Sequence, residues 1–163
     1  MTAKPQSPTR DYTVGALTPE AFLAMNMFIV RHLVRLYAAF DGDLVGAIVL
    51  GEVAHHNLSA YVADAATARR TNVSAATPVP SPDDYLPTNA FSIAQATGIP
   101  RQTVRRKVKS LVERGWLIED RRGLVVSRVP FDHFSALNAA LAADVMETLN
   151  VVLTLTRPSS GKR

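Results

Sequence analysis

Basic and amide side chains follow one another between residues 101 and 109, on a segment whose apolar residues recur at helical spacing. Val104, Val108, Leu111 and Val112 would form one buried stripe of such a helix, so the basic and amide residues would lie on its opposite side. Arginine can donate two hydrogen bonds to the edge of guanine, glutamine can pair with adenine, and lysine neutralises phosphates. The chemistry predicted for this face is contact with a nucleic acid.

The position of each residue on this helix suggests its role. The first turn of a helix in the major groove usually reaches the base edges. Four residues are therefore candidate base readers: Arg101, Gln102, Thr103 and Arg106. Three more are candidate contacts to the phosphate backbone: Arg105, Lys107 and Lys109. A merely solvated face is the alternative, but such a face usually mixes charges of both signs, and only Glu113, Glu119 and Asp120 oppose the basic residues here.

Caps and turns predict the elements that hold this helix. Asn89 or Ser92 can cap a short preceding helix, and Gly98 supplies the left-handed residue that ends it. Pro100 suits the start of the second helix, and Gly115 stops that helix. The sequence therefore predicts a helix, a tight turn and a second helix.

A β-hairpin is predicted directly after the second helix. Residues Trp116 to Ser127 read as two short strands around a turn. Arg121 and Arg122 at the tip would lie along a phosphate backbone or enter the minor groove. We interpret Trp116 as core packing of the hairpin, with stacking on a base as the alternative.

This order of elements resembles a known family. The run SIAQATGIPRQTVRRKV from Ser92, followed by LVERGWL from Leu111 and a basic turn, is similar to the winged helix-turn-helix of bacterial transcriptional regulators of the MarR and IclR kinds. The resemblance covers about forty of the 163 residues. It implies a mainly α fold in which a three-helix core carries a two-stranded β-wing, and it implies DNA binding.

Six segments are expected along the chain. Thr18 can cap a first helix that begins at Pro19, and the Asp41-Gly42-Asp43 sequence separates it from a second helix between Leu44 and about Val62. The expected segments are a disordered arm at 1–17, an N-terminal helical region at 18–64, a proline-rich loop or linker at 65–87, the winged domain at 88–128, a long C-terminal helix at 130–156 and a tail at 157–163.

The two terminal helical regions predict a homodimer. Apolar residues recur at spacings of three and four from Phe22 to Phe40 and again from Phe134 to Val152. A long terminal helix with an apolar stripe commonly pairs with a helix of a second chain. Two-fold symmetry would then place two recognition helices in successive major grooves, about 34 Å apart.

Charge is distributed unevenly along the chain. The total is 18 basic against 14 acidic residues, a net charge of +4. Between Asn89 and Arg128 there are nine basic and three acidic residues, whereas the rest of the chain has nine basic and eleven acidic residues. The predicted winged domain is therefore where an anionic partner should bind.

Several classes of protein and site are not expected. The chain has no cysteine, so disulfides, cysteine-ligated metals and cysteine nucleophiles are excluded. The first sixteen residues contain no apolar run, so no signal peptide is predicted. The longest candidate stretch, Leu44 to Ala54, contains Glu52 and is shorter than the about 20 apolar residues that are needed to cross a membrane. We therefore expect a cytoplasmic protein without a membrane span.

Neither catalysis nor metal binding is indicated. The sequence shows no phosphate-binding glycine loop, nucleophile elbow or triad spacing, so we expect no enzyme and no cofactor. His55 and His56 are adjacent and would point about 100° apart on a helix, so structural or surface roles are favoured over metal ligation. Asp83-Asp84 is read as a turn or cap pair, and Arg69-Arg70 as solvated loop, with a secondary phosphate contact as its alternative.

The function expected from these patterns is sequence-specific DNA binding by a transcriptional regulator, with double-stranded DNA as its partner. Two other functions stay open. The chain would be a protein-interaction module if the winged domain docked on another protein without specific DNA readout. It would be a ligand sensor if a small-molecule effector filled a pocket between the helices.

Overall fold

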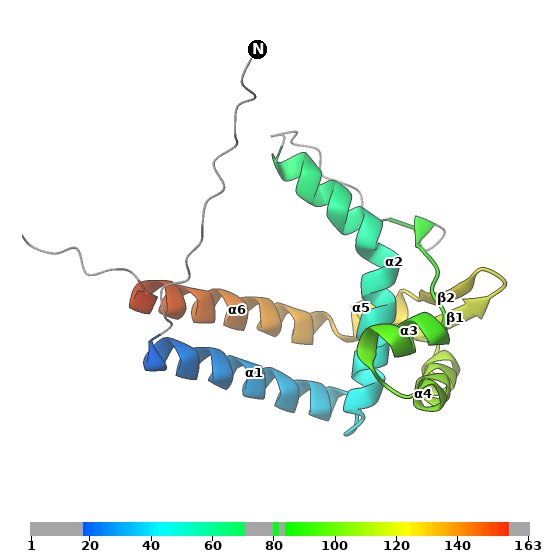
Figure 1. Cartoon of the computed structure of the whole chain (residues 1–163), viewed down its shortest axis with the longest axis horizontal. Helices are drawn as coiled ribbons and strands as arrows, with labels where there is room; N and C mark the ends of the chain where they lie inside the picture. The colour runs from blue at the N-terminus through cyan, green and yellow to red at the C-terminus, as the bar shows by residue number, and fades with distance from the viewer. Residues whose placement is uncertain (1–17, 71–79, 82–83, 157–163) are drawn as a thin grey trace, which may run out of the picture. The chain divides into compact units, whose positions relative to one another are not determined.

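The structure of the chain is a computed structural model that describes residues 18–70, 80–81 and 84–156 (Figure 1). The predicted arm at 1–17, the predicted tail at 157–163, Asp83 and the side chains of Arg69 and Arg70 lie outside the described residues. The described chain divides into two compact units. One is Leu33–Ala139, and the other combines Met1–His32 with Ala140–Arg163.

The predicted mainly α fold with a small hairpin is confirmed. The described residues form these elements in order: α1 (Pro19–Ala39), α2 (Leu44–Arg70), α3 (Ala90–Thr97), α4 (Arg101–Glu113), β1 (Leu117–Asp120), β2 (Gly123–Val126), α5 (Val129–His133) and α6 (Ser135–Thr156).

Sequence-local signals set the ends of the first two helices. The Thr18 hydroxyl accepts a hydrogen bond from the Ala21 N–H at 3.2 Å, which is the predicted N-cap. Asp41 and Gly42 both have positive φ, and the Gly42 N–H donates to the Tyr37 carbonyl at 2.8 Å. Asp43 then caps α2, because its Oδ1 accepts the Gly46 N–H at 2.8 Å. The predicted break at residues 41–43 is therefore correct.

Helix α2 is longer than predicted. It continues beyond Val62 and ends at Arg70, so the first residues of the predicted 65–87 loop are helical. The extension is rich in alanine and ends in two arginines, which are strong helix formers. The prolines from which the loop was inferred begin only at Pro78.

The short helix, turn and second helix follow the predicted caps. Asn89 Oδ1 accepts the N–H groups of Phe91 and Ser92, each at 3.0 Å, at the start of α3. Gly98 has φ +70° and ends that helix. Pro100, with φ −53°, precedes the first residue of α4, and Gly115 has φ +71° just beyond its end.

Strands β1 and β2 form an antiparallel hairpin in which Leu117 pairs with Val126 and Asp120 with Gly123. The segment before α3 adds a bridge to it, since Thr88 and Leu124 exchange N–H···O bonds of 3.1 and 2.8 Å. Gly123 has φ +134°, and a Cβ atom there would collide with the Thr88 carbonyl oxygen. Only glycine therefore permits this close approach of the two backbones.

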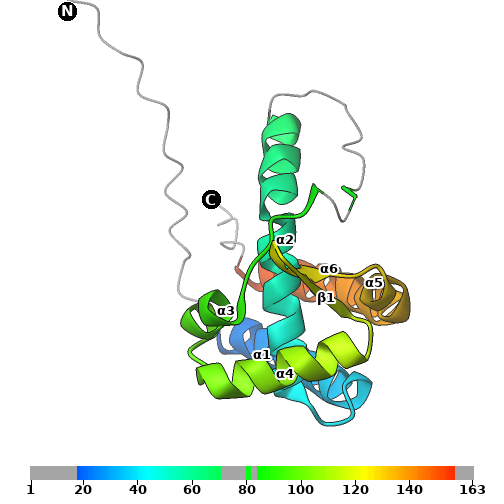
Figure 2. The same cartoon turned by 90° about the vertical axis from the view of Figure 1, so that its right-hand side faces the viewer.

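The core of unit Leu33–Ala139 is built around α2, which packs against α3, α4 and β2 (Figures 1 and 2). Val49 and Val53 of α2 are fully buried. Phe40, Trp116 and Phe134 form an aromatic cluster with ring centroids 4.9–5.5 Å apart. Trp116 is buried, as the core-packing interpretation predicts.

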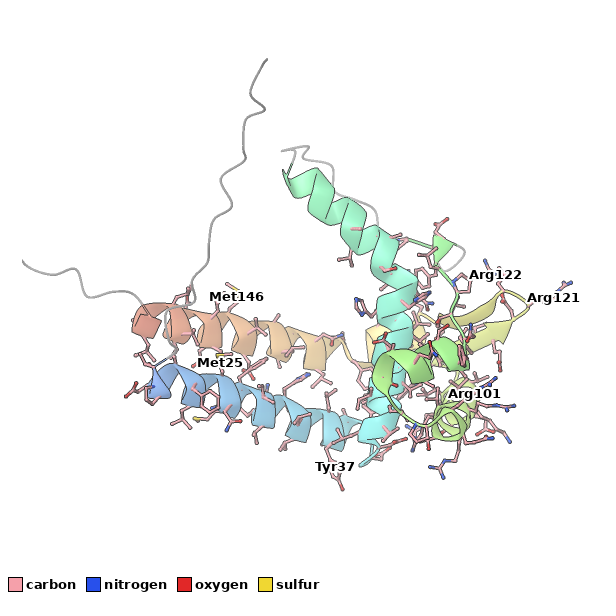
Figure 3. The ribbon with its side chains drawn as sticks, in the orientation of Figure 1. Met25, Tyr37, Arg101, Arg121, Arg122 and Met146 are labelled. Carbon is pink, nitrogen blue, oxygen red and sulfur yellow. The ribbon has the colours of Figure 1, made fainter. Side chains whose placement is uncertain are left out.

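The unit that combines Met1–His32 with Ala140–Arg163 contains the greater part of α1 and of α6. Met25 and Met146, labelled in Figure 3, belong to a large set of exposed apolar side chains on these two segments. The set comprises Phe22, Leu23, Met25, Met27, Ile29, Val30, Val145, Met146, Leu149, Val151, Leu153 and Leu155.

Two helical stretches, Pro19–Ala39 and Ser135–Leu155, are long and apolar enough to cross a membrane by length and composition alone. The expectation that no segment has these properties is wrong. Polar residues such as Asn26, Arg31 and Glu147 interrupt the apolar runs, but the mean hydropathy of each helix stays high enough for a membrane span. The core helix of a soluble protein and a signal sequence pass the same test.

Candidate nucleic-acid interface

Helix α4 has one buried and one exposed face. Val104, Val108 and Leu111 are buried against the core. The opposite face is formed by five of the predicted contact residues, all of them exposed: Arg101, Gln102, Arg105, Arg106 and Lys109. A hollow of about 780 Å³ runs beside this face and is lined by Gln102, Arg105, Arg106, Lys109, Glu113 and Glu119, among others. We call these five exposed residues the α4 face.

Two predicted contact residues lie off the α4 face. Thr103 is half-buried. The Lys107 side chain is only 21% exposed, and its Nζ forms an ion pair of 2.7 Å with Asp43 Oδ1. Lys107 therefore contacts the cap of α2, whereas the sequence suggested a phosphate contact from helical periodicity alone.

Asp43 has two structural roles at this contact, since it caps α2 and binds Lys107 of α4. Burial alone would raise the pKa of its carboxyl group. The hydrogen bonds from Lys107 and from the Gly46 N–H, together with the charges of Lys107 and Arg114, outweigh burial and lower that pKa. The carboxylate is thus held in its charged form between the two helices.

The end of α4 has a looser contact with the same turn. Arg114 lies 4.0 Å from the Asp41 carboxylate, and its guanidinium carbon lies 5.2 Å from the centroid of the Trp116 ring. This pairing is largely exposed and adds little to stability. It still directs Arg114 back toward the protein, in contrast to the residues of the α4 face.

The two arginines at the hairpin tip differ in their surroundings. Asp120 binds Arg122 twice, because its Oδ1 accepts the Arg122 N–H at 2.7 Å and its Oδ2 accepts from Arg122 Nε at 3.2 Å. The backbone N–H of Arg122 is the main cause of the lowered pKa of Asp120. Arg121 points outward at the far end of the hairpin (Figure 3). The tip thus presents one outward cation and one that is held by a carboxylate.

A buried amide fixes the hairpin to the helical core. Asn57 of α2 is 2% exposed. Its Nδ2 donates to the carbonyls of Leu86 and Leu124 at 2.7 and 3.2 Å, and its Oδ1 accepts the Val126 N–H at 2.7 Å. One side chain therefore connects α2 to β2 and to the segment that leads into α3.

No family model, curated protein or solved structure matches this chain. The chemistry of the interface therefore follows from its own residues: several exposed cations and one amide on α4, and basic residues at a hairpin anchored to the same core.

Three residues at or near the interface were not predicted from the sequence. Phe91 of α3 is exposed beside Arg101, Asp43 binds Lys107, and Asn57 anchors the hairpin. The partner of Asp43 is 64 positions away and those of Asn57 are 29 to 69 positions away, where no local pattern indicates them. For Phe91, the signal in the sequence was a large apolar residue in the first turn of the helix that precedes the basic helix.

A separate cavity of about 440 Å³ lies between α2, the segment before α3 and α5. Tyr61, Tyr85, Arg128 and Phe131 are among its lining residues. Burial raises the pKa of the Tyr85 phenol, and the nearby Arg128 charge offsets part of that rise. Among the described residues, no group of three or more histidine, aspartate or glutamate side chains could hold a metal ion.

Proposed function

We propose that this chain is a sequence-specific DNA-binding transcriptional regulator in which α3, α4 and the hairpin act as a winged helix-turn-helix. In this proposal α4 is the recognition helix and the hairpin is the wing. The bridge between Thr88 and Leu124 supports it by giving the hairpin a third, short strand partner. A helix of this kind fits the major groove, and the wing reaches the adjacent backbone or minor groove.

The observation that carries the proposal is the two-sided character of α4. Its buried valines and leucine fix the orientation of the helix, while the α4 face presents guanidinium, amide and ammonium groups side by side. These are the groups that read guanine and adenine edges and neutralise phosphates. Glu113 and Glu119 beside them would disfavour misplaced phosphates.

The experiment that tests the proposal begins with selection of bound duplexes from a random DNA library. Arg105→Ala should weaken binding to selected and unselected duplexes alike and lower the slope of log affinity against log salt by about 0.9. Arg106→Ala should also relax sequence preference, at a cost of about 1–3 kcal/mol for the preferred duplex.

The control for these two variants is Arg31→Ala, which removes one positive charge from α1 and should change neither the slope nor the preference. If Arg105→Ala together with Arg106→Ala bound duplex DNA as well as the parent at every salt concentration, α4 would not be the recognition helix. Capture of one stoichiometric protein partner without preference among DNA sequences would instead favour the protein-interaction module.

The homodimer belongs to the same proposal. The many exposed apolar side chains on α1 and α6 support it, because large exposed apolar surfaces usually mark an interface. A two-fold dimer would bind pseudo-palindromic DNA with half-sites about 34 Å apart. We also retain a cytoplasmic location, non-enzymatic action and the absence of a cofactor as parts of the proposal.

Control by a small-molecule effector is a second candidate function. The cavity lined by Tyr85 and Arg128 favours it, since its volume of about 440 Å³ lies within the range of small-ligand sites. Its mixture of aromatic rings with one guanidinium and one carboxylate is the usual composition of such a site.

A further inference from the structure

Arg101, the first residue of α4, lies over the ring of Phe91 from the first turn of α3. The guanidinium carbon is 5.6 Å from the ring centroid, within the range of a cation–π interaction. Both side chains are at the surface, and Phe91 is 51% exposed. Phe91 is exposed next to the α4 face, whereas Ile93 of the same helix is buried.

The backbone around this pair fixes both partners. The Asn89 side chain holds the Phe91 N–H at the start of α3. Thr97 closes the same helix, because its hydroxyl donates to the Ile93 carbonyl at 2.7 Å and accepts the Ile99 N–H at 3.3 Å. The turn that follows ends at Pro100, so the position of Arg101 relative to the Phe91 ring is set by short-range contacts.

The kind of contact matters for what Arg101 can still bind. A carboxylate partner occupies N–H donors, as Asp120 does with Nε of Arg122. An aromatic ring attracts the charge through its face and leaves the five guanidinium N–H groups available. Within the described part of the chain, the Arg101 side chain makes no hydrogen bond or ion pair.

We propose that Phe91 is a positioning residue that holds the Arg101 guanidinium ready to donate to a guanine edge or a phosphate at the start of the recognition helix. This role rests on the proposed function. Because the ring restricts the arginine before binding, less side-chain freedom is lost when DNA binds. The ring itself needs no contact with DNA for this effect.

The test is a double-mutant cycle on binding to the selected duplex. Phe91→Ala should weaken binding about two- to five-fold in the parent chain, because the released Arg101 side chain then loses more conformational freedom when DNA binds. It should have no further effect once Arg101→Ala is present. Phe91→Trp should retain parental affinity, whereas Phe91→Leu, which keeps an apolar side chain without a ring, should behave like Phe91→Ala.

Two controls separate positioning from general stability. Val129→Ala removes a comparably exposed apolar side chain from α5 and should leave the affinity and the cycle unchanged. All Phe91 variants should remain folded, with a Tm within a few degrees of the parent, because the ring is half exposed. In the free protein, NMR should show a ring-current shift of the Arg101 Nε–H signal that is absent in Phe91→Leu.

Three results would contradict the positioning role, the Phe91–Arg101 pair or the proposed function, respectively. A Phe91→Ala effect that persists in the Arg101→Ala background, or parental binding by Phe91→Leu, would overturn the positioning role while leaving DNA binding intact. A missing ring-current shift would overturn the pair itself. If the parent chain bound no duplex at all, the proposed function would fail and the positioning role would fail with it.

Discussion

The two units of the chain treat their apolar side chains in opposite ways. In Leu33–Ala139, the helices and the hairpin share a core that buries Val49, Trp116 and Leu124. In the described residues of the other unit, Ala21 is the only buried hydrophobic side chain, although its helical segments are rich in leucine, valine and methionine. The first unit has the buried core of a domain, whereas the second leaves most of its apolar side chains exposed, which is typical of a surface that binds another one.

The largest expected difference between the two units is in the stability lost when an asparagine is replaced by alanine. Asn57→Ala removes the partner of the buried Val126 N–H and of the Leu86 carbonyl, so we expect a loss of about 3 kcal/mol in the free energy of unfolding. Asn26→Ala in α1 changes an exposed residue and should alter stability by less than about 0.5 kcal/mol. Urea denaturation of both variants measures the difference, and equal losses would contradict the anchoring role of Asn57.

Sequence patterns predicted the local parts of this architecture well. Asn89, Gly98 and the break at residues 41–43 follow rules that act over a few residues, and each was predicted from those rules. The α4 face was likewise predicted by helical spacing, because Val104 and Val108 define the buried side on their own.

Long-range contacts account for what the sequence did not predict. Helical spacing alone could not separate Lys107 from the contact residues around it, because its partner Asp43 lies 64 positions earlier. Asn57 read as one polar residue in a helix, with no sign of the carbonyls it binds. The membrane-length helices were missed because an unbroken run of apolar residues was required of them.

A smaller effect is expected where α4 meets the cap of α2. Lys107→Met and Asp43→Asn should each reduce stability by about 1 kcal/mol at neutral pH, as for a partly buried ion pair. Because the pKa of Asp43 is lowered in the folded chain, its contribution to the free energy of unfolding is present above about pH 3.9, the usual pKa of an unfolded aspartate. That contribution is lost as the pH falls through the lower pKa of the folded state. The stability gap between parent and Asp43→Asn should therefore narrow in acid, which urea titrations across pH measure.

The matched control for this pair is Lys109→Met, since Lys109 is 79% exposed and only 3.9 Å from Glu113. Lys109→Met should hardly change stability but should lower the salt slope of DNA binding by about 0.9, whereas Lys107→Met should leave the slope unchanged. An equal fall in both slopes would return Lys107 to the phosphate contacts.

The smallest effect in dilute solution should come from the unit with the exposed helices. Phe22→Ser changes a side chain that is 64% exposed, so it should cost less than about 0.5 kcal/mol when the chain is monomeric. If a homodimer forms, the parent Tm rises with protein concentration, and Phe22→Ser should reduce that rise. Ile118→Ser in the hairpin should not, and a parent Tm independent of concentration would contradict the dimer.

Gly123 has a consequence for how variation along this chain should be interpreted. The residue is half-buried and follows the turn of the hairpin as the first residue of β2, and its backbone conformation and its approach to Thr88 exclude every side chain. In a saturation mutagenesis screen, position 123 should therefore tolerate as few substitutions as a residue that contacts a binding partner. Arg121 lies two residues earlier, at a position where side chains can vary without backbone strain. Substitutions there should reduce fitness only when the cation itself is needed for binding, so the two positions distinguish architectural constraint from recognition.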